Sequence, residues 1–202
     1  MTSKPARIAA TITLLAAALA ARAEYNPMDD LLSEAASTAA KISEAPPEEL
    51  EKLKQDPRYQ RYLNGGWEVF QNAKGAPRGE YCSALYWQQD SFLAISGPGG
   101  EYRGAMLTFW GPDIPQPLHN RKLRVTLKQT GDTGQTVQAF NYRKSSEPYG
   151  AIAFAVPSIE AALEGMNGAQ GFEILVEGRR VLKLEWQDGA QAKQQMLDCL
   201  RR

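Results

Sequence analysis

The sequence predicts a mainly β protein of the α+β class. We expect an antiparallel β-sandwich or open barrel, with a C-terminal helix packed on it and a helical N-terminal extension. Three observations support this. Short β-rich segments recur between residues 66 and 186, separated by Gly- and Pro-containing turns. Residues 24–63 contain no glycine and are rich in Ala, Glu and Lys. The two cysteines lie in segments predicted to be ordered.

The first 23 residues have the pattern of a secretory signal peptide. Lys4 and Arg7 precede the uncharged run 8–20, and Ala21-Arg22-Ala23 supplies the small residues that signal peptidase accepts. The run is shorter than the roughly 20 apolar residues of a membrane anchor. We therefore expect cleavage after Ala23, no integral span in the mature protein, and a periplasmic or secreted location. Cleavage removes three basic residues and no acid, so the formal charge falls from 0 to −3.

The segment 24–64 is predicted to be a helical extension. Asp29 or Asp30 is expected to cap a first helix that runs to about Ile42 and ends before Pro46-Pro47. A second helix over 48–55 and a further turn over 59–63 follow. The stripe on the first helix is mostly alanine and buries little area, so this helix needs a surface to pack on. Two interpretations stay open, an extension docked on its own domain and an arm that binds another protein.

The segment 65–202 is predicted to be the β-rich domain. Alternation and β-branched content predict strands at 67–70, 81–87, 92–95, 105–110, 123–127, 137–142, 151–156, 172–176 and 181–186. A short helix over 159–166 is expected with Ser158 as its cap, and a last helix over 190–200 with Asp188 as its cap.

Cys82 and Cys199 are predicted to form one structural disulfide, because two cysteines of an exported protein pair most simply with each other. The bond would close a loop of more than a hundred residues and attach the C-terminal helix to the sheet. A redox pair is disfavoured, because redox cysteines are closely spaced.

Composition and motifs disfavour several chemistries. A formal charge of zero and a pI near 6.6 argue against nucleic acid as a partner. Two cysteines and one histidine argue against a metal site, and no cofactor motif is present. The glycine-rich segment 97–100 lacks the Lys-Ser/Thr of a phosphate loop, so a turn is predicted there.

A proline-rich loop is the most distinctive surface candidate. Three prolines stiffen residues 110–118, and a rigid loop that carries apolar groups loses little entropy on contact with a partner. The alternative is that Trp110 simply ends a core strand. His119 follows the loop and has no recognisable catalytic motif around it. The candidate binding residues are Trp110, Pro112, Asp113, Ile114, Pro115, Leu118 and His119.

The β-rich part resembles the invasion-associated locus B family of small exported proteobacterial proteins. The resemblance lies in the signal peptide, the opening Gly66-Trp67-Glu68-Val69, Cys82 in a strand, Ala153-Phe154-Ala155-Val156 before a short helix, and Asp188-Gly189-Ala190 before the last one. The chain departs from the family's pattern at Phe70-Gln71, where a cysteine is often found, in lacking a second cysteine pair, and in its helical lead. The resemblance implies an envelope or secreted protein associated with host-cell contact or stress, and it supplies no catalytic residue.

The leading hypothesis is a non-catalytic periplasmic or secreted binding protein. Its partner would be another envelope or secreted protein, met through the extension or the loop, and an inhibitor or immunity function belongs to this class. A second hypothesis is an envelope hydrolase whose carboxylates converge in the fold, with Glu68, Glu80, Asp90, Glu101 and Asp113 as possible members. A third is a lipid or small-ligand carrier, which requires an apolar cavity between the sheets.

Overall fold

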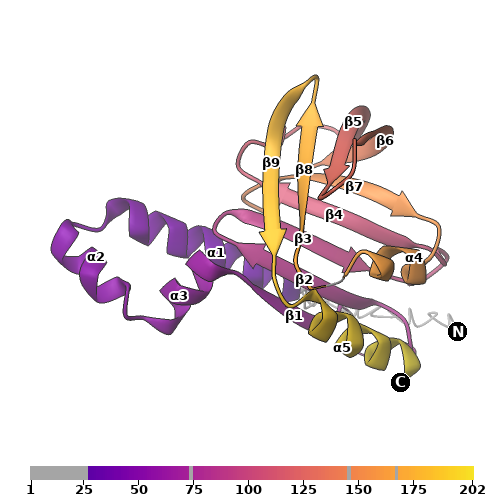
Figure 1. Ribbon diagram of the computed structural model, residues 1–202, viewed down its shortest axis with the longest axis horizontal. Coiled ribbons are helices and arrows are strands. Elements are labelled where there is room, and N and C mark those ends of the chain that lie inside the picture. The colour runs from indigo at the N-terminus through magenta and orange to yellow at the C-terminus, as the bar shows by residue number, and fades with distance from the viewer. Residues whose placement is uncertain (1–26, 73–74, 145–146, 167) are drawn as a thin grey trace, which may run out of the picture.

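The computed structural model describes residues 27–72, 75–144, 147–166 and 168–202. The predicted signal peptide lies outside these ranges. These residues form five helices and nine strands (Figure 1). They are α1 (Pro27–Glu44), α2 (Pro47–Leu53), α3 (Pro57–Asn64), β1 (Gly66–Gln71), β2 (Cys82–Gln88), β3 (Ser91–Ser96), β4 (Ala105–Gly111), β5 (Arg121–Gln129), β6 (Gln135–Tyr142), β7 (Gly150–Val156), α4 (Ile159–Glu164), β8 (Gln170–Val176), β9 (Arg179–Trp186) and α5 (Gly189–Arg201).

The predicted fold class is confirmed, since all nine strands form one antiparallel sheet in the order β1-β2-β3-β4-β7-β6-β5-β8-β9. The sheet curls until its first and last strands approach each other. The rings of Trp67 on β1 and Trp186 on β9 meet edge to face, with centroids 5.5 Å apart. The result is a nearly closed barrel in which β6 and β7 join the two halves through three residue pairs, Phe140 to Tyr142 against Ala151 to Ala153.

The inner face of the sheet holds the main core. Large side chains that alternate along the strands point inward and are almost fully buried, among them Phe109, Ile152 and Trp186. Phe109 contacts Phe154 and Phe172 edge to face. This aromatic packing contributes more than its buried area alone, because edge-to-face rings attract each other electrostatically.

The outer face of β2, β3 and β4 forms a second apolar cluster that the N-terminal helices cover. Trp87, Phe92 and Trp110 lie opposite one another in neighbouring strands. Leu32 of α1 and Tyr62 of α3 pack in the same cluster, and Leu32 has no exposed surface. The extension therefore docks on its own domain at its base.

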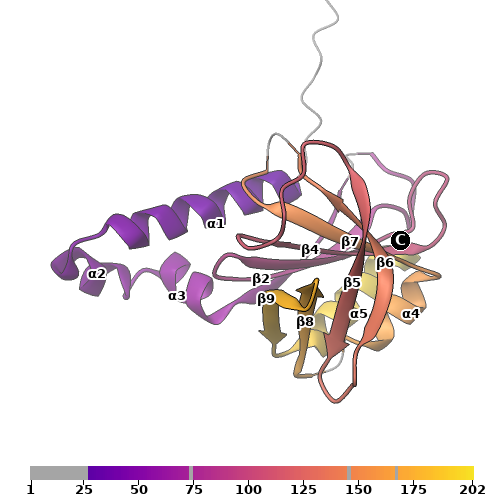
Figure 2. The same ribbon diagram turned by 90° about the horizontal axis from the view of Figure 1, so that it is seen from above.

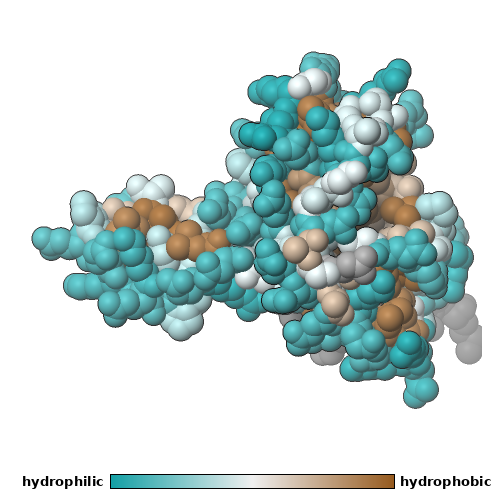
Figure 3. All heavy atoms as spheres, viewed as in Figure 1, coloured by the Kyte–Doolittle hydropathy of each residue, from teal (hydrophilic) through white to brown (hydrophobic). Residues whose placement is uncertain are grey.

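Beyond this base, α1, α2 and α3 project away from the barrel as an arm (Figures 1 and 2). No residue of α2 is buried. Ala39 and Ile42 of α1 are only partly buried, and Figure 3 shows hydrophobic atoms along the arm over α1. Docking on its own domain is therefore observed for the base of the extension, and binding of another protein by the projecting end stays a prediction.

The arm joins the barrel at a glycine. Gly65 follows α3 with φ +76°, a conformation that favours glycine. A Cβ at this position would overlap the hydroxyl of Tyr86. The turn from arm to β1 therefore depends on the missing side chain of Gly65.

The predicted disulfide between Cys82 and Cys199 is confirmed, and it joins β2 to α5 across 117 residues of sequence. Ala192 and Met196 of α5 are buried, and the helix packs against β1 and β2. In the chain-entropy model, a loop of this length contributes about 5 kcal/mol to stability. The helix starts differently from the prediction. Asp188 adopts a left-handed backbone with φ +58°, and its side chain makes no cap hydrogen bond.

Candidate binding site on the outer face of the sheet

A groove of about 490 Å³ opens on the outer face of β3, β4, β7 and β6, beside the start of α1. Ala94, Thr108, Ala153 and Phe140 form one cross-strand row along it, because each faces the next in the register of the sheet. Small side chains in this row leave a hollow where larger ones would fill the space. The remaining lining residues are Met28, Asn72, Ser96, Met106, Trp110, Asn120, Tyr142 and Lys144.

The groove is lined mostly by apolar and neutral polar side chains, and Lys144 is the one charged residue among the described residues of its lining. Met28 and Met106 offer flexible thioethers that adapt to different shapes. Asn72 donates from Nδ2 to the hydroxyl of Ser83 at 2.6 Å, which fixes its side chain at the groove's edge. Burial, together with the negative charge of Glu147, raises the pKa of Tyr142, so this hydroxyl stays protonated. Such a lining suits contact with a neutral or mixed surface.

A charged network closes the groove where the β6–β7 connection meets α1. The side chain of Glu147 is fully buried and accepts from Trp110 Nε1 at 2.9 Å. Lys144 Nζ lies 2.9 Å from Glu147 Oε1 and 3.6 Å from Asp29 Oδ1. Partial burial alone would lower the pKa of Lys144, but the hydrogen bond and charge of Glu147, with Asp29, outweigh it and leave the pKa raised. This network ties α1 to the barrel beside the groove.

A second group of polar contacts attaches α3 to the barrel. Asp90, in the β2–β3 turn, accepts from the hydroxyl of Tyr149 at 2.8 Å and from that of Tyr62 at 3.3 Å. Burial and the negative charge of Asp90 raise the pKa of Tyr62 to about 12, and burial with the hydrogen bond to Asp90 raises that of Tyr149. Both hydroxyls therefore remain donors at neutral pH.

In the structure, some residues of the predicted binding loop are buried and others are exposed. Trp110 and Ile114 are buried, at 4% and 2% exposed. Trp110 is the last residue but one of β4 and lines the groove, and Ile114 packs into the main core. Leu118 is 96% exposed, so of Trp110, Ile114 and Leu118 it alone offers an exposed side chain to a partner. Pro112, Asp113 and His119 are exposed and Pro115 is half-buried.

The carboxylates considered for a hydrolase have other contacts. Glu68 pairs with Arg61, and Glu80 with Arg103 at 2.6 Å. Asp90 accepts the two tyrosine hydroxyls. Glu101 and Asp113 are exposed. Across the described ranges, no group of three or more His, Cys, Asp and Glu side chains gathers as a metal site would require.

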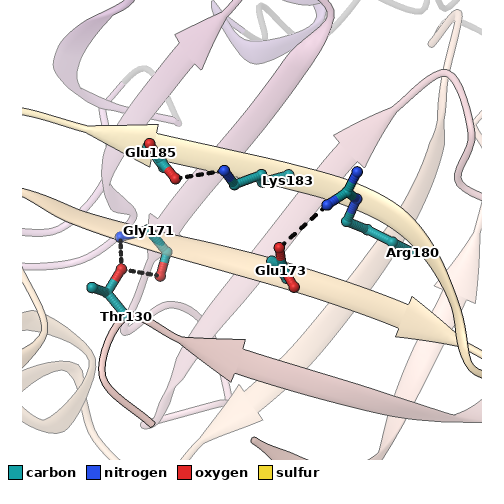
Figure 4. Close-up of polar contacts among 6 residues, drawn as sticks. All are labelled: Thr130, Gly171, Glu173, Arg180, Lys183 and Glu185. Atoms are coloured by element: carbon teal, nitrogen blue, oxygen red, sulfur yellow. Dashed lines mark hydrogen bonds and ion pairs between the residues drawn. The ribbon is translucent and has the colours of Figure 1, made fainter. Parts of the chain in front are cut away.

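The outer face of the other half of the barrel carries many charges. Figure 4 shows that Arg180 reaches Glu173 and Lys183 reaches Glu185 on β8 and β9, at 3.4 and 2.8 Å. Thr130 exchanges two hydrogen bonds with Gly171 and extends the pairing of β5 with β8. Lys122 and Arg124 on the neighbouring strand β5 have no acidic partner among the described residues.

A second cleft, of about 440 Å³, lies between α4 and the end of the barrel. Its lining is largely apolar and includes Leu107, Leu127, Met166, Phe172 and Trp186. A volume of this size is within the range of small-molecule pockets.

Sequence reasoning missed most of the outer-face groove. Strands at 92–95 and 105–110 are predicted from the sequence, but the row of small residues forms because 105–110 pairs with 92–95 on one side and with the distant segment 151–156 on the other. Glu147 gave no signal, since a single glutamate in a polar loop is normally exposed.

Comparison of the chain with family models, with curated proteins and with solved structures finds no match. The resemblance to the invasion-associated locus B family stays a prediction. In the described part of the chain, no helix has both the length and the apolar content needed to cross a membrane.

Proposed function

We propose that the protein is a non-catalytic binding protein of the periplasm or the extracellular space. Its partner would be another envelope or secreted protein, as in inhibitor or immunity pairs. The outer-face groove carries this proposal. It has a floor held rigid by four paired strands, and its walls offer apolar contacts beside neutral hydroxyl and amide groups.

The disulfide supports the location in this proposal. Disulfides persist in oxidising compartments, so a bond between Cys82 and Cys199 fits an exported protein. The pattern of residues 1–23 points the same way. The barrel then acts as a stable scaffold that holds the groove open.

Filling the groove tests the proposal. Ser96 lies at the groove's edge on β3 and is partly exposed, so Ser96→Phe is expected to occupy the hollow without disturbing the core. Ser91→Phe is the matched control, because Ser91 is a partly exposed serine of the same strand that does not line the groove. Both variants and the parent 24–202 protein are used for affinity capture from envelope extract and culture fluid.

The expected result is one stoichiometric protein partner that the parent and Ser91→Phe capture and Ser96→Phe loses. A partner captured equally by all three proteins would contradict a role for the groove. Capture of no protein at any salt concentration would contradict the proposed function as a whole.

The cleft beside α4 favours a second candidate function, that of a carrier for a small apolar ligand. Trp186 lines this cleft and would report occupancy through its fluorescence. Titration with a long-chain fatty acid is expected to change the fluorescence saturably if the cleft is a carrier site. Narrowing the cleft with Ala162→Phe should remove this response, and a response that survives the substitution would place the ligand elsewhere.

A further inference from the structure

We infer that the free edge of β6 binds an extended, acidic segment of the protein partner by strand addition. The inference rests on the proposed function and names the kind of segment that the partner presents. The site consists of residues 135–139 of β6, with Phe140 at its end and Lys122 and Arg124 beside it.

The edge exists because β6 and β7 separate after a short contact. They pair only from Phe140 to Tyr142, while β6 begins at Gln135. Residues 135–139 are paired with β5 on one side. Among the described residues, no backbone group is bonded to them on the other side. Alternate residues of this stretch therefore direct N–H and C=O groups outward, over a length of about 17 Å.

The strand lacks the features that usually protect an edge. Proteins block exposed edges with charged residues, proline or a covering element. The sequence of β6, Gln-Thr-Val-Gln-Ala-Phe-Asn-Tyr, has neither charge nor proline. Residues 135–138 are all exposed, with Val137 at 38%.

The other two edges of the sheet show the contrast. The last strand, β9, carries Arg179, Arg180, Lys183 and Glu185. The first strand, β1, packs against α5. The free part of β6 is thus an uncharged, exposed edge, unlike the edges at β1 and β9, and an extended peptide could continue the sheet there through main-chain hydrogen bonds.

Two cations beside the free edge indicate that the added segment is acidic. Lys122 and Arg124 alternate along β5 on the outer face and are directly opposite Phe140 and Gln138. Both cations are exposed, and neither has an acidic partner among the described residues. Lys122 instead lies over the ring of Phe140, 5.4 Å from its centre. A strand added to β6 would lie about 10 Å from β5, a distance that long acidic and basic side chains bridge.

The free edge also leads into the groove. Phe140 lines the groove and is the residue at which the pairing with β7 begins. A segment that lies along residues 135–139 therefore enters the groove when it continues past Phe140. A second copy of the chain is the weaker occupant, because two β6 edges side by side would bring two rows of unpaired cations together.

The experiment uses the 24–202 protein and two blocked six-residue peptides. One alternates valine or threonine with glutamate, and the other has lysine in place of each glutamate. Binding is measured by fluorescence anisotropy, and backbone amide exchange of residues 135–139 is measured by NMR with and without peptide. The variant Lys122→Ala/Arg124→Ala removes the unpaired cations. Arg180→Ala/Lys183→Ala is the control, because it removes the same charge from cations of the same sheet that already have acidic partners.

The glutamate peptide is expected to bind at least tenfold more tightly than the lysine peptide and to slow exchange of alternate amides in 135–139 at least tenfold. Lys122→Ala/Arg124→Ala should weaken its binding about tenfold, and the control less than twofold. Equal binding of both peptides, or unchanged exchange at millimolar glutamate peptide, would overturn the inference.

Three further outcomes separate this inference from its alternatives. A dimer by sedimentation that protects 135–139 would make a second copy the occupant and overturn the proposal. Binding to phosphatidylglycerol vesicles that depends on Lys122 and Arg124, without amide protection by peptide, would overturn it in favour of a lipid surface. A captured partner that is lost with Ser96→Phe but leaves exchange of 135–139 unchanged would overturn strand addition while supporting the proposed function.

Discussion

The indole N–H of Trp110 donates to the buried carboxylate of Glu147 at 2.9 Å, and this contact joins the end of β4 to the connection before β7. The same carboxylate holds Lys144, which reaches Asp29 on α1. One buried acid therefore links the barrel, the groove and the arm.

Glu147→Ala is expected to destabilise the protein by about 3 kcal/mol, because it removes a buried acceptor, leaves the indole N–H of Trp110 unpaired and takes from Lys144 the nearer of its two acidic partners. Glu147→Gln should cost less, since an amide oxygen still accepts from Trp110. Urea unfolding measures both. Glu160→Ala, an exposed glutamate of α4, is the control and should change stability by less than about 0.5 kcal/mol. Equal effects of the Glu147 and Glu160 substitutions would refute the role of this contact.

Removal of the disulfide is expected to lower stability by about 5 kcal/mol, since the cross-link closes 117 residues of chain. The double variant Cys82→Ala/Cys199→Ala is compared with the parent by urea unfolding, and the parent with and without reductant serves as a second comparison. Free-thiol labelling of the native exported protein should find no thiol. Two reactive thiols in that protein would contradict the bond.

The base and the end of the arm should respond differently to truncation. Leu32→Ala removes a fully buried side chain between α1 and the sheet and is expected to cost about 3 kcal/mol. Ile42→Ala, further along the same helix and only partly buried, should cost less than about 1 kcal/mol. Thermal and urea unfolding provide the measurement. Similar costs at the two positions would mean that the whole arm is part of the core.

High pH should weaken the contact of the arm with the barrel. The pKa of Tyr62 is raised from about 10 to about 12 in the folded protein, so between these values the unfolded chain releases a proton that the folded protein retains. This contribution to stability is complete below pH 10 and is lost as the pH rises towards 12. The free energy of unfolding, measured by urea titration from pH 8 to 11.5, should fall less steeply in Tyr62→Phe than in the parent. Tyr59→Phe removes a hydroxyl from the same helix as a control, and identical pH slopes for all three proteins would disprove the assignment.

The strands were predictable because their pattern is local. In β5, for example, Leu123 and Val125 alternate with Arg124 and Thr126. That alternation predicts both the strand and which of its faces is exposed to solvent. The disulfide was predictable because the chain has two cysteines. The order of the strands was not, since nothing in the sequence next to β4 indicates that β7 will pair with it.

That non-local pairing also explains why the candidate sites escaped prediction. The row from Ala94 to Thr108 and Ala153 exists only after β3, β4 and β7 are assembled. The free edge of β6 depends on where β7 diverges, which follows from packing of the barrel halves and not from the residues of β6. Sequence patterns of single strands describe faces, whereas edges and grooves depend on neighbours.

The arm has a consequence for the dimensions of any partner. Lys144 and Asp90 fix its base at two points, through Asp29 and Tyr62, so the direction of α1 is set by the barrel. Met28 lines the groove at one end of this helix, and Glu44 ends it at the other. Glu44 is sixteen positions after Met28, and at 1.5 Å of rise per residue the helix between them spans about 24 Å. The length of α1 therefore fixes the distance between the groove and the far end of the arm. A partner that touches both must carry two contact points at that spacing.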